Sequence, residues 1–242
     1  MRKLTTYDEI ENLCEAMIKD FMKRKHYTNT HCVDIEAFVT EYLGIPIVYE
    51  NFAEPDPGRI GFFSDGIRPV WVFRGGKKVQ TIFPAETAVI ENVLQMPKEI
   101  GRKRFTIAHE GAHYVIGQHI PGQAKAAFHS DYDGEVVYSV DMLKEMMSIT
   151  ETFTNRAAAC LLMPRFIVLR VLKCYNNGKK IPAFDGYVLA QEYKYTIQRM
   201  ADAMGVNYLP LFTRLKELGL FEMRPIEEYL EQQFYRGGGQ QA

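Results

Sequence analysis

Apolar residues recur every three or four positions near the N-terminus, which is the spacing of one face of an α-helix. The pattern predicts an amphipathic helix over residues 7–25 and a second helix over residues 33–43, ended by Gly44. The inward-facing residues expected in the first helix are Ile10, Leu13, Met17 and Phe21. We therefore expect the N-terminal part of the chain to be helical and to bury one side of each helix.

The pattern then changes to that of short β-strands, which are rich in branched and aromatic side chains. Four strands are predicted, over residues 45–49, 59–63, 69–73 and 79–83. Two turn sequences lie between them, Asp65-Gly66 and Gly75-Gly76. We expect a small, mostly antiparallel sheet, which either presents an edge strand to an extended peptide or serves only as a packing surface for helices.

A motif with recognisable chemistry follows the strands. His109, Glu110 and His113 form the pattern His-Glu-x-x-His in a segment predicted to be helical. Two histidines four residues apart share one helical face, where neutral imidazoles can bind one Zn²⁺ and the glutamate can act on metal-bound water. The flanking apolar residues are Phe105, Ile107, Ala108, Ala112, Val115 and Ile116. They predict a buried helix, which argues against a pair of solvated surface histidines because buried imidazoles need partners.

A catalytic zinc site needs a third protein ligand, and His119 is one candidate. It has the spacing of the metzincin pattern His-Glu-x-x-His-x-x-Gly-x-x-His. However, Ile116 occupies the glycine position of that pattern, and Gly117 comes one residue late. Gly117 and His119 are more simply interpreted as the end of the helix.

Glu151 is the other candidate for the third ligand. It precedes Asn155 by four residues in a segment predicted to be helical and to end at Pro164. A glutamate that faces two histidines on another helix, with an amide one turn further on to hold a ligand, is a common zinc-site arrangement. On these residues alone, Glu151 could equally be a charge near the start of a helix.

The two motifs together resemble the ImmA/IrrE family of bacterial metallo-endopeptidases. The resemblance rests on Arg104-Phe-Thr-Ile-Ala-His-Glu-Gly-Ala-His113-Tyr and on Glu151-x-x-x-Asn155, which leads into Leu-Leu-Met-Pro164. It extends over about residues 33–220, nearly the whole chain. Two departures from the family pattern are Gly111-Ala112 in place of Leu-Gly and Thr154 in place of Ala, and neither removes a chemical group.

The resemblance implies roles for four residues. His109, His113 and Glu151 correspond to the zinc ligands and Glu110 to the catalytic glutamate, beside the ligand-supporting amide already expected of Asn155. It further implies a protein substrate, typically a helix-turn-helix transcriptional repressor cleaved at a specific site. We therefore expect a zinc-dependent endopeptidase, and the alternative is a metal-stabilised module that binds and sequesters a regulator without cleaving it.

The residue that would stabilise the oxyanion of such a reaction is not specified by these motifs. Five side chains are candidates: Tyr114, His119, His129, Tyr132 and Arg156.

Composition and charge argue against several other classes of protein. The chain has 242 residues and a net charge of −1, which gives no electrostatic basis for binding nucleic acid or an anionic membrane. It has no apolar signal region at the N-terminus and no run of membrane-spanning length, so a cytoplasmic protein is expected. The four cysteines, Cys14, Cys32, Cys160 and Cys174, form no Cys-x-x-Cys pair and are interpreted as reduced thiols of the core.

The last third of the chain is predicted to be helical. Residues 201–207, followed by Leu211, have the spacing of a helix-turn-helix. The second helix would begin near Asn207 with aromatic and aliphatic residues, where base recognition needs Arg, Asn or Gln. We therefore interpret this region as structural or as recognising protein, and direct binding of nucleic acid is not expected.

The expected fold is α+β, with N-terminal helices, a small sheet and a His-Glu-x-x-His helix in a zincin-like core over residues 1–165. A helical C-terminal lobe is expected over residues 166–236, either separate or sharing the core, and a flexible tail over residues 237–242.

Overall fold

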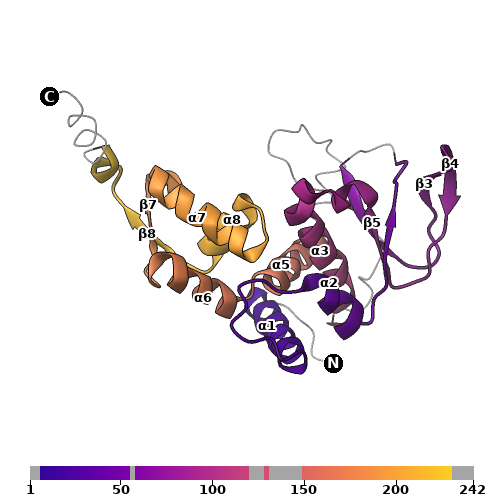
Figure 1. Ribbon diagram of the computed structural model, residues 1–242, viewed down its shortest axis with the longest axis horizontal. Helices are drawn as coiled ribbons and strands as arrows, with labels where there is room; N and C mark the ends of the chain where they lie inside the picture. Colours follow the sequence, from indigo (N-terminus) through magenta and orange to yellow (C-terminus); the bar gives the residue numbers. More distant parts are fainter. Residues whose placement is uncertain (1–5, 55–57, 120–127, 131–148, 231–242) are drawn as a thin grey trace. The chain divides into compact units, whose positions relative to one another are not determined.

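The chain adopts an α+β fold in the computed structural model (Figure 1). The structure describes residues 6–54, 58–119, 128–130 and 149–230. It divides into two compact units, Met1–Pro164 and Arg165–Ala242. The predicted tail lies outside the described residues. Within them, no helix combines the length and the apolar character that crossing a bilayer requires.

The first unit opens with helix α1, Tyr7–Arg24, as predicted. A capping box starts it, because the Thr6 hydroxyl accepts a hydrogen bond from the Glu9 N–H while the Glu9 carboxylate accepts one from the Thr6 N–H. The fully buried residues of α1 are Ile10, Glu11, Cys14, Ile18 and Phe21. The predicted inward residues Leu13 and Met17 are only partly buried. The buried stripe is rotated because α1 also packs against α5.

The second predicted helix is shorter and less regular than expected. Helix α2, Ile35–Ala37, continues directly into a π-helical turn, η1, Phe38–Tyr42. Gly44 ends it with a φ of 75°, the left-handed conformation that glycine adopts without steric cost.

A mixed four-stranded sheet lies at the centre of the first unit, in the order β1-β5-β2-β6. Its strands are β1 Ile47–Glu50, β5 Thr87–Glu91, β2 Arg59–Ser64 and β6 Phe128–Ser130. β1 and β5 are parallel, and β2 is antiparallel to both of its neighbours. β5 was not predicted, because four of its five residues are buried and the run shows no alternation of apolar and polar positions.

Two of the predicted strands form a separate ribbon instead of joining the sheet. β3, Val70–Arg74, pairs with β4, Lys77–Thr81, across a tight turn in which Gly75 and Gly76 both have positive φ. The ribbon packs on one face of the sheet through Val70 and Val72, in a cluster with Phe62, Phe83 and Val89.

Two long helices form the layer that carries the histidines. Helix α3, Ile100–His119, follows two short 3₁₀ turns, η2 Asn92–Gln95 and η3 Pro97–Glu99, and packs against β2, β5 and α5. Helix α5, Ile149–Leu162, packs between α3 and α1. Since side chains alternate along a strand, β2 turns Phe62 toward the ribbon and Gly61 toward α3.

The second unit contains strands as well as helices, which corrects the prediction of a purely helical lobe. Its helices are α6 Arg165–Asn176, α7 Gln191–Met204 and α8 Tyr208–Glu217, with a 3₁₀ turn, η4 Asp185–Tyr187. β7, Ile181–Phe184, pairs in parallel with β8, Phe221–Arg224. The two strands were missed because they are short and their pairing joins segments far apart in the sequence.

The helix-turn-helix pattern in the second unit corresponds to α7 and α8. α7 ends at Gly205, whose φ is 64°, and α8 begins three residues later. Arg214 is the arginine of α8, and it is fully buried and paired with Glu217, whose carboxylate lies 3.4 Å away. Its guanidinium is therefore not presented to solvent.

The cysteines are free thiols, but they do not all belong to the core. Cys14 and Cys160 are buried, Cys32 is partly buried and Cys174 is exposed. The prediction of four core thiols was therefore wrong for Cys174, which lies on the solvent side of α6 near its end.

Candidate metal centre

The two histidines of the His-Glu-x-x-His motif meet on the inner face of α3. His109 is fully buried and His113 is 3% exposed. Their Nε2 atoms lie 3.0 Å apart, with the ring planes inclined at 79°. The four-residue spacing brings both rings to one side of the helix, as expected from the helical period.

Glu151 on α5 completes a group of three. Its Oε2 lies 3.4 Å from Nε2 of His109, and its Oε1 lies 3.7 Å from Nε2 of His113. One ligand atom from each residue falls within 4.8 Å of the other two. The packing of α5 on α3 therefore brings a carboxylate to two imidazoles that lie about forty residues earlier in the chain.

Asn155 determines which nitrogen of His109 carries the proton. Nδ1 of His109 lies 3.0 Å from Oδ1 of Asn155. An amide oxygen only accepts, so Nδ1–H must be the donor, and Nε2 of a neutral His109 is then unprotonated. A supporting hydrogen bond of this kind orients a metal-binding imidazole and increases its basicity.

Phe63 on β2 supports the other imidazole. Its ring stacks on His113, with a centroid separation of 6.2 Å and an interplanar angle of 21°. Phe63 was predicted only as a strand residue. The alternation of β2, which directs Gly61 and Phe63 to the same face as α3, is the signal that could have identified it.

The side chains of His109, His113 and Glu151 could together hold a divalent metal ion. Ligand atoms about 2.0–2.1 Å from a tetrahedral ion lie about 3.3 Å from one another. The two Nε2 atoms lie 3.0 Å apart, and the 3.4 and 3.7 Å separations from them to the two oxygens of Glu151 are close to that value. An unprotonated Nε2 that faces a second imidazole nitrogen and a carboxylate also needs a cation or a proton between them.

Glu110 lies beside this group in an unusual environment. It is fully buried, and neither carboxylate oxygen has a hydrogen-bond partner among the described residues. Burial, and to a smaller extent the charge of Glu151, raise the pKa of Glu110 well above its usual range. A buried carboxyl group without partners is costly for stability, so this arrangement calls for a reason other than folding.

The carboxyl group of Glu110 occupies space that only a glycine on β2 leaves open. A Cβ at position 61 would collide with Oε1 of Glu110 and would lie 2.6 Å from Cγ2 of Thr106. Gly61 therefore permits the close approach of α3 to the sheet at the position of Glu110. Gly61 was not among the predicted site residues, because its role depends on how α3 packs on β2.

His119 takes no part in the group. α3 continues through Gly117 and ends at His119, and the imidazole Nδ1 of His119 lies 2.8 Å from the carbonyl oxygen of Val115. Ten residues of continuous helix separate it from His109 by about 15 Å along the axis. The metzincin arrangement, in which the chain turns back before the third histidine, is not present.

None of the other candidates for stabilising an oxyanion is shown to contact the histidine group among the described residues. The guanidinium of Arg156 is engaged by Glu11 on α1, at 3.2 Å. Tyr114 is a partly buried residue of α3. Tyr132 lies outside the described residues, and the side chain of His129 does as well.

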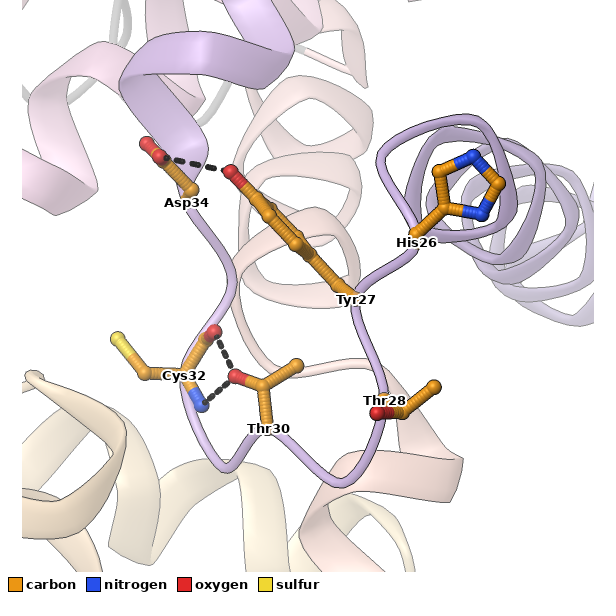
Figure 2. A pocket seen from close by; sticks show the side chains of 6 residues that line it. All are labelled: His26, Tyr27, Thr28, Thr30, Cys32 and Asp34. Atoms are coloured by element: carbon orange, nitrogen blue, oxygen red, sulfur yellow. Dashed lines mark hydrogen bonds between the residues drawn. The ribbon is translucent and has the colours of Figure 1, made fainter.

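A separate cavity of about 430 Å³ lies in the loop between α1 and α2 (Figure 2). It is lined by His26, Tyr27, Thr28, Thr30, Cys32 and Asp34. The Thr30 hydroxyl donates to the carbonyl oxygen of Cys32 at 2.6 Å and accepts from its N–H at 3.1 Å. The Tyr27 hydroxyl lies 3.5 Å from the Asp34 carboxylate. These hydrogen bonds stabilise the conformation of the loop. The cavity shares no residue with the group His109, His113 and Glu151.

No family model matches the sequence, and no curated protein matches it.

Proposed function

We propose that the protein is a zinc-dependent endopeptidase of the ImmA/IrrE type. The observation that carries the proposal is the buried Glu110 carboxyl group, without a hydrogen-bond partner among the described residues, beside the group His109, His113 and Glu151. A merely structural metal site would gain nothing from such a glutamate. A hydrolase needs a group there to hold and transfer a proton.

Two imidazoles and one carboxylate are a typical ligand set of catalytic zinc sites. We therefore assign His109, His113 and Glu151 as ligands of Zn²⁺ and Asn155 as the residue that holds His109 in the binding tautomer. When bound, the ion would act as a Lewis acid and lower the pKa of a water molecule.

Glu110 would transfer the proton of the reaction. Its carboxylate accepts a proton from the attacking water and then donates it to the nitrogen of the leaving amine. Burial raises the pKa of Glu110, which gives the carboxylate the proton affinity that this role needs, and a cation close by would lower that pKa again. Gly61 leaves room for the carboxyl group against β2.

The fold of the first unit supports this proposal. We interpret the sheet, the His-Glu-x-x-His helix α3 and the glutamate-bearing helix α5 as a zincin-like core. An edge strand of such a sheet can pair with an extended peptide and so bring a peptide bond to the ligands.

The substrate class follows from the resemblance of the sequence to the family. We propose a protein substrate, in particular a helix-turn-helix transcriptional repressor cleaved at one site. The second unit would recognise protein and not DNA, because Arg214 of α8 is buried while Leu209 is 62% exposed.

Replacement of Glu110 by Gln tests the enzymatic proposal. Glu110→Gln keeps the size of the side chain but removes the base, so we expect the fold and the bound zinc to persist while cleavage falls by about 10² or more. Glu15→Gln, at a partly buried position of α1 paired with Lys19, is the matched control and should cleave like the wild type. Candidate substrates are repressor-like proteins encoded beside this one.

The alternative function predicts a different result for the same variants. If the wild type and the Glu110→Gln protein relieve the same repressor equally well, cleavage is not the mechanism. The protein would then be a metal-stabilised module that sequesters the regulator.

A further inference from the structure

A second buried charge cluster lies on the other side of α5. Glu11 of α1 is fully buried. Nη2 of Arg156 lies 3.2 Å from Oε2 of Glu11, and the Cys160 thiol donates to the same oxygen at 3.1 Å. The Arg156 guanidinium also lies over the ring of Tyr7, 5.6 Å from its centroid. The cluster therefore ties α5 to α1 through directional contacts.

Stability alone does not explain a buried ion pair at this place. Removing a carboxylate from water costs several kcal/mol, and apolar residues of similar volume are often as stable as a buried ion pair or more so. An ion pair differs from an apolar contact because its hydrogen bonds are directional. They form only in one relative position of the two helices.

The position of the cluster on α5 connects it to the metal centre. Glu151 and Asn155 are four residues apart and share one face of α5, and Arg156 and Cys160 share another. Arg156 follows Asn155 directly, about 100° further round the helix. A rotation or shift of α5 against α1 would therefore move Asn155 away from His109 and Glu151 away from both imidazoles.

We propose that Glu11 and Arg156 are positioning residues for the metal centre. Their ion pair sets the rotation and axial position of α5, and α5 in turn holds the Asn155 amide on His109 and the Glu151 carboxylate beside the two imidazoles. The inference rests on the proposed metal centre, and it assigns to the N-terminal helix a function beyond packing.

Three variants of the full-length protein test the proposal. Glu11→Gln keeps the shape of the side chain and removes its charge, and Glu15→Gln makes the same change one turn along α1, in a surface pair with Lys19. The double variant Glu11→Met/Arg156→Met replaces the ion pair by apolar side chains. For each we would measure Zn²⁺ affinity by competition with a chelator, the absorption spectrum of the Co²⁺-loaded protein, and thermal unfolding without metal.

We expect Glu11→Gln to weaken Zn²⁺ binding about tenfold or more and to shift the Co²⁺ ligand-field bands, while Glu15→Gln changes neither. The double variant should unfold without metal at or above the wild-type temperature and still bind Zn²⁺ more weakly. This separation of stability from affinity is what a merely structural pair would not produce.

Two results would overturn the inference. If the double variant, or Glu11→Gln should the double variant not fold, has wild-type Zn²⁺ affinity and a wild-type Co²⁺ spectrum, the pair does not position the site. If the wild type binds neither ion, the metal centre itself is wrong and the positioning role fails with it. A protein that binds both ions but cleaves nothing would contradict only the proposed endopeptidase activity.

Discussion

Among the described residues of the first unit, two glutamates are fully buried, in different environments. Glu11 is bonded to Arg156 and Cys160, as expected of a carboxylate that contributes to structure. Glu110 has no hydrogen-bond partner among the described residues, and burial raises its pKa well above the usual range. The same residue type therefore supports two different proposals, positioning for Glu11 and proton transfer for Glu110.

The assignment of Glu151 as a ligand predicts a loss of metal on its replacement. Glu151→Ala removes one of three ligands, so we expect a larger loss of Zn²⁺ affinity than the roughly 10–100-fold that a supporting hydrogen bond contributes. Zinc content after purification and chelator competition measure it. His119→Ala is the matched control, since His119 is bonded to the backbone of its own helix and should leave zinc binding unchanged. Full zinc retention by Glu151→Ala would show that the ligand set is wrong.

At the scale of elements, the site depends on how closely the sheet, α3 and α5 pack against one another. The sheet lies between the β3–β4 ribbon and α3, while α5 lies between α3 and α1. On the site side, α3 approaches β2 closely at Gly61, where a Cβ would collide with Glu110. The spacing between α3 and the sheet at the site therefore depends on Gly61, which carries no side chain.

Gly61→Ala should disturb this approach. The added methyl group would meet Glu110 and the stiff side chain of Thr106, so we expect a loss of about 1–3 kcal/mol in the free energy of unfolding. Urea titration measures this loss. Cleavage per folded molecule should fall as well, because Oε1 of Glu110 must move.

Gly111→Ala is the comparison for this variant. Its Cβ would lie 2.7 Å from Cγ2 of Val39, so it should also lower the free energy of unfolding. Side chains at successive positions of a helix do not face each other, so the added methyl group should leave Glu110 in place and affect cleavage less. Equal loss of cleavage in the two variants, or a fully stable Gly61→Ala protein, would contradict the role assigned to Gly61.

At the scale of the whole molecule, the proposed metal ligands belong to one unit. His109, His113 and Glu151 all lie in Met1–Pro164, as does Trp71, the single tryptophan of the chain. Tryptophan fluorescence therefore reports the unfolding of the unit that we propose binds metal.

Metal removal should therefore destabilise one unit selectively. A ligand present at a thousand times its Kd stabilises the unit that binds it by about 4 kcal/mol, and a chelator removes that contribution. We expect the thermal transition of Trp71 fluorescence to move to lower temperature, while a second calorimetric transition from Arg165–Ala242 stays in place. An equal shift of both transitions would show that the two units unfold together.

Features that depend on neighbouring residues could be predicted from the sequence alone. Helix α1, the helix end at Gly44, the Gly75-Gly76 turn and the common face of His109 and His113 all follow from local periodicity and backbone preferences. The α+β class follows from the same patterns.

Features that depend on distant segments were decided only by the tertiary structure. The sequence left two candidates for the third member of the group. α3 continues straight to His119, and the packing of α5 brings Glu151 to the histidines. β5, the pairing of β7 with β8, the space at Gly61 and the burial of Glu11 were likewise absent from the prediction. Each arises from contact between elements far apart in the chain, which hydrophobic period and turn chemistry do not encode.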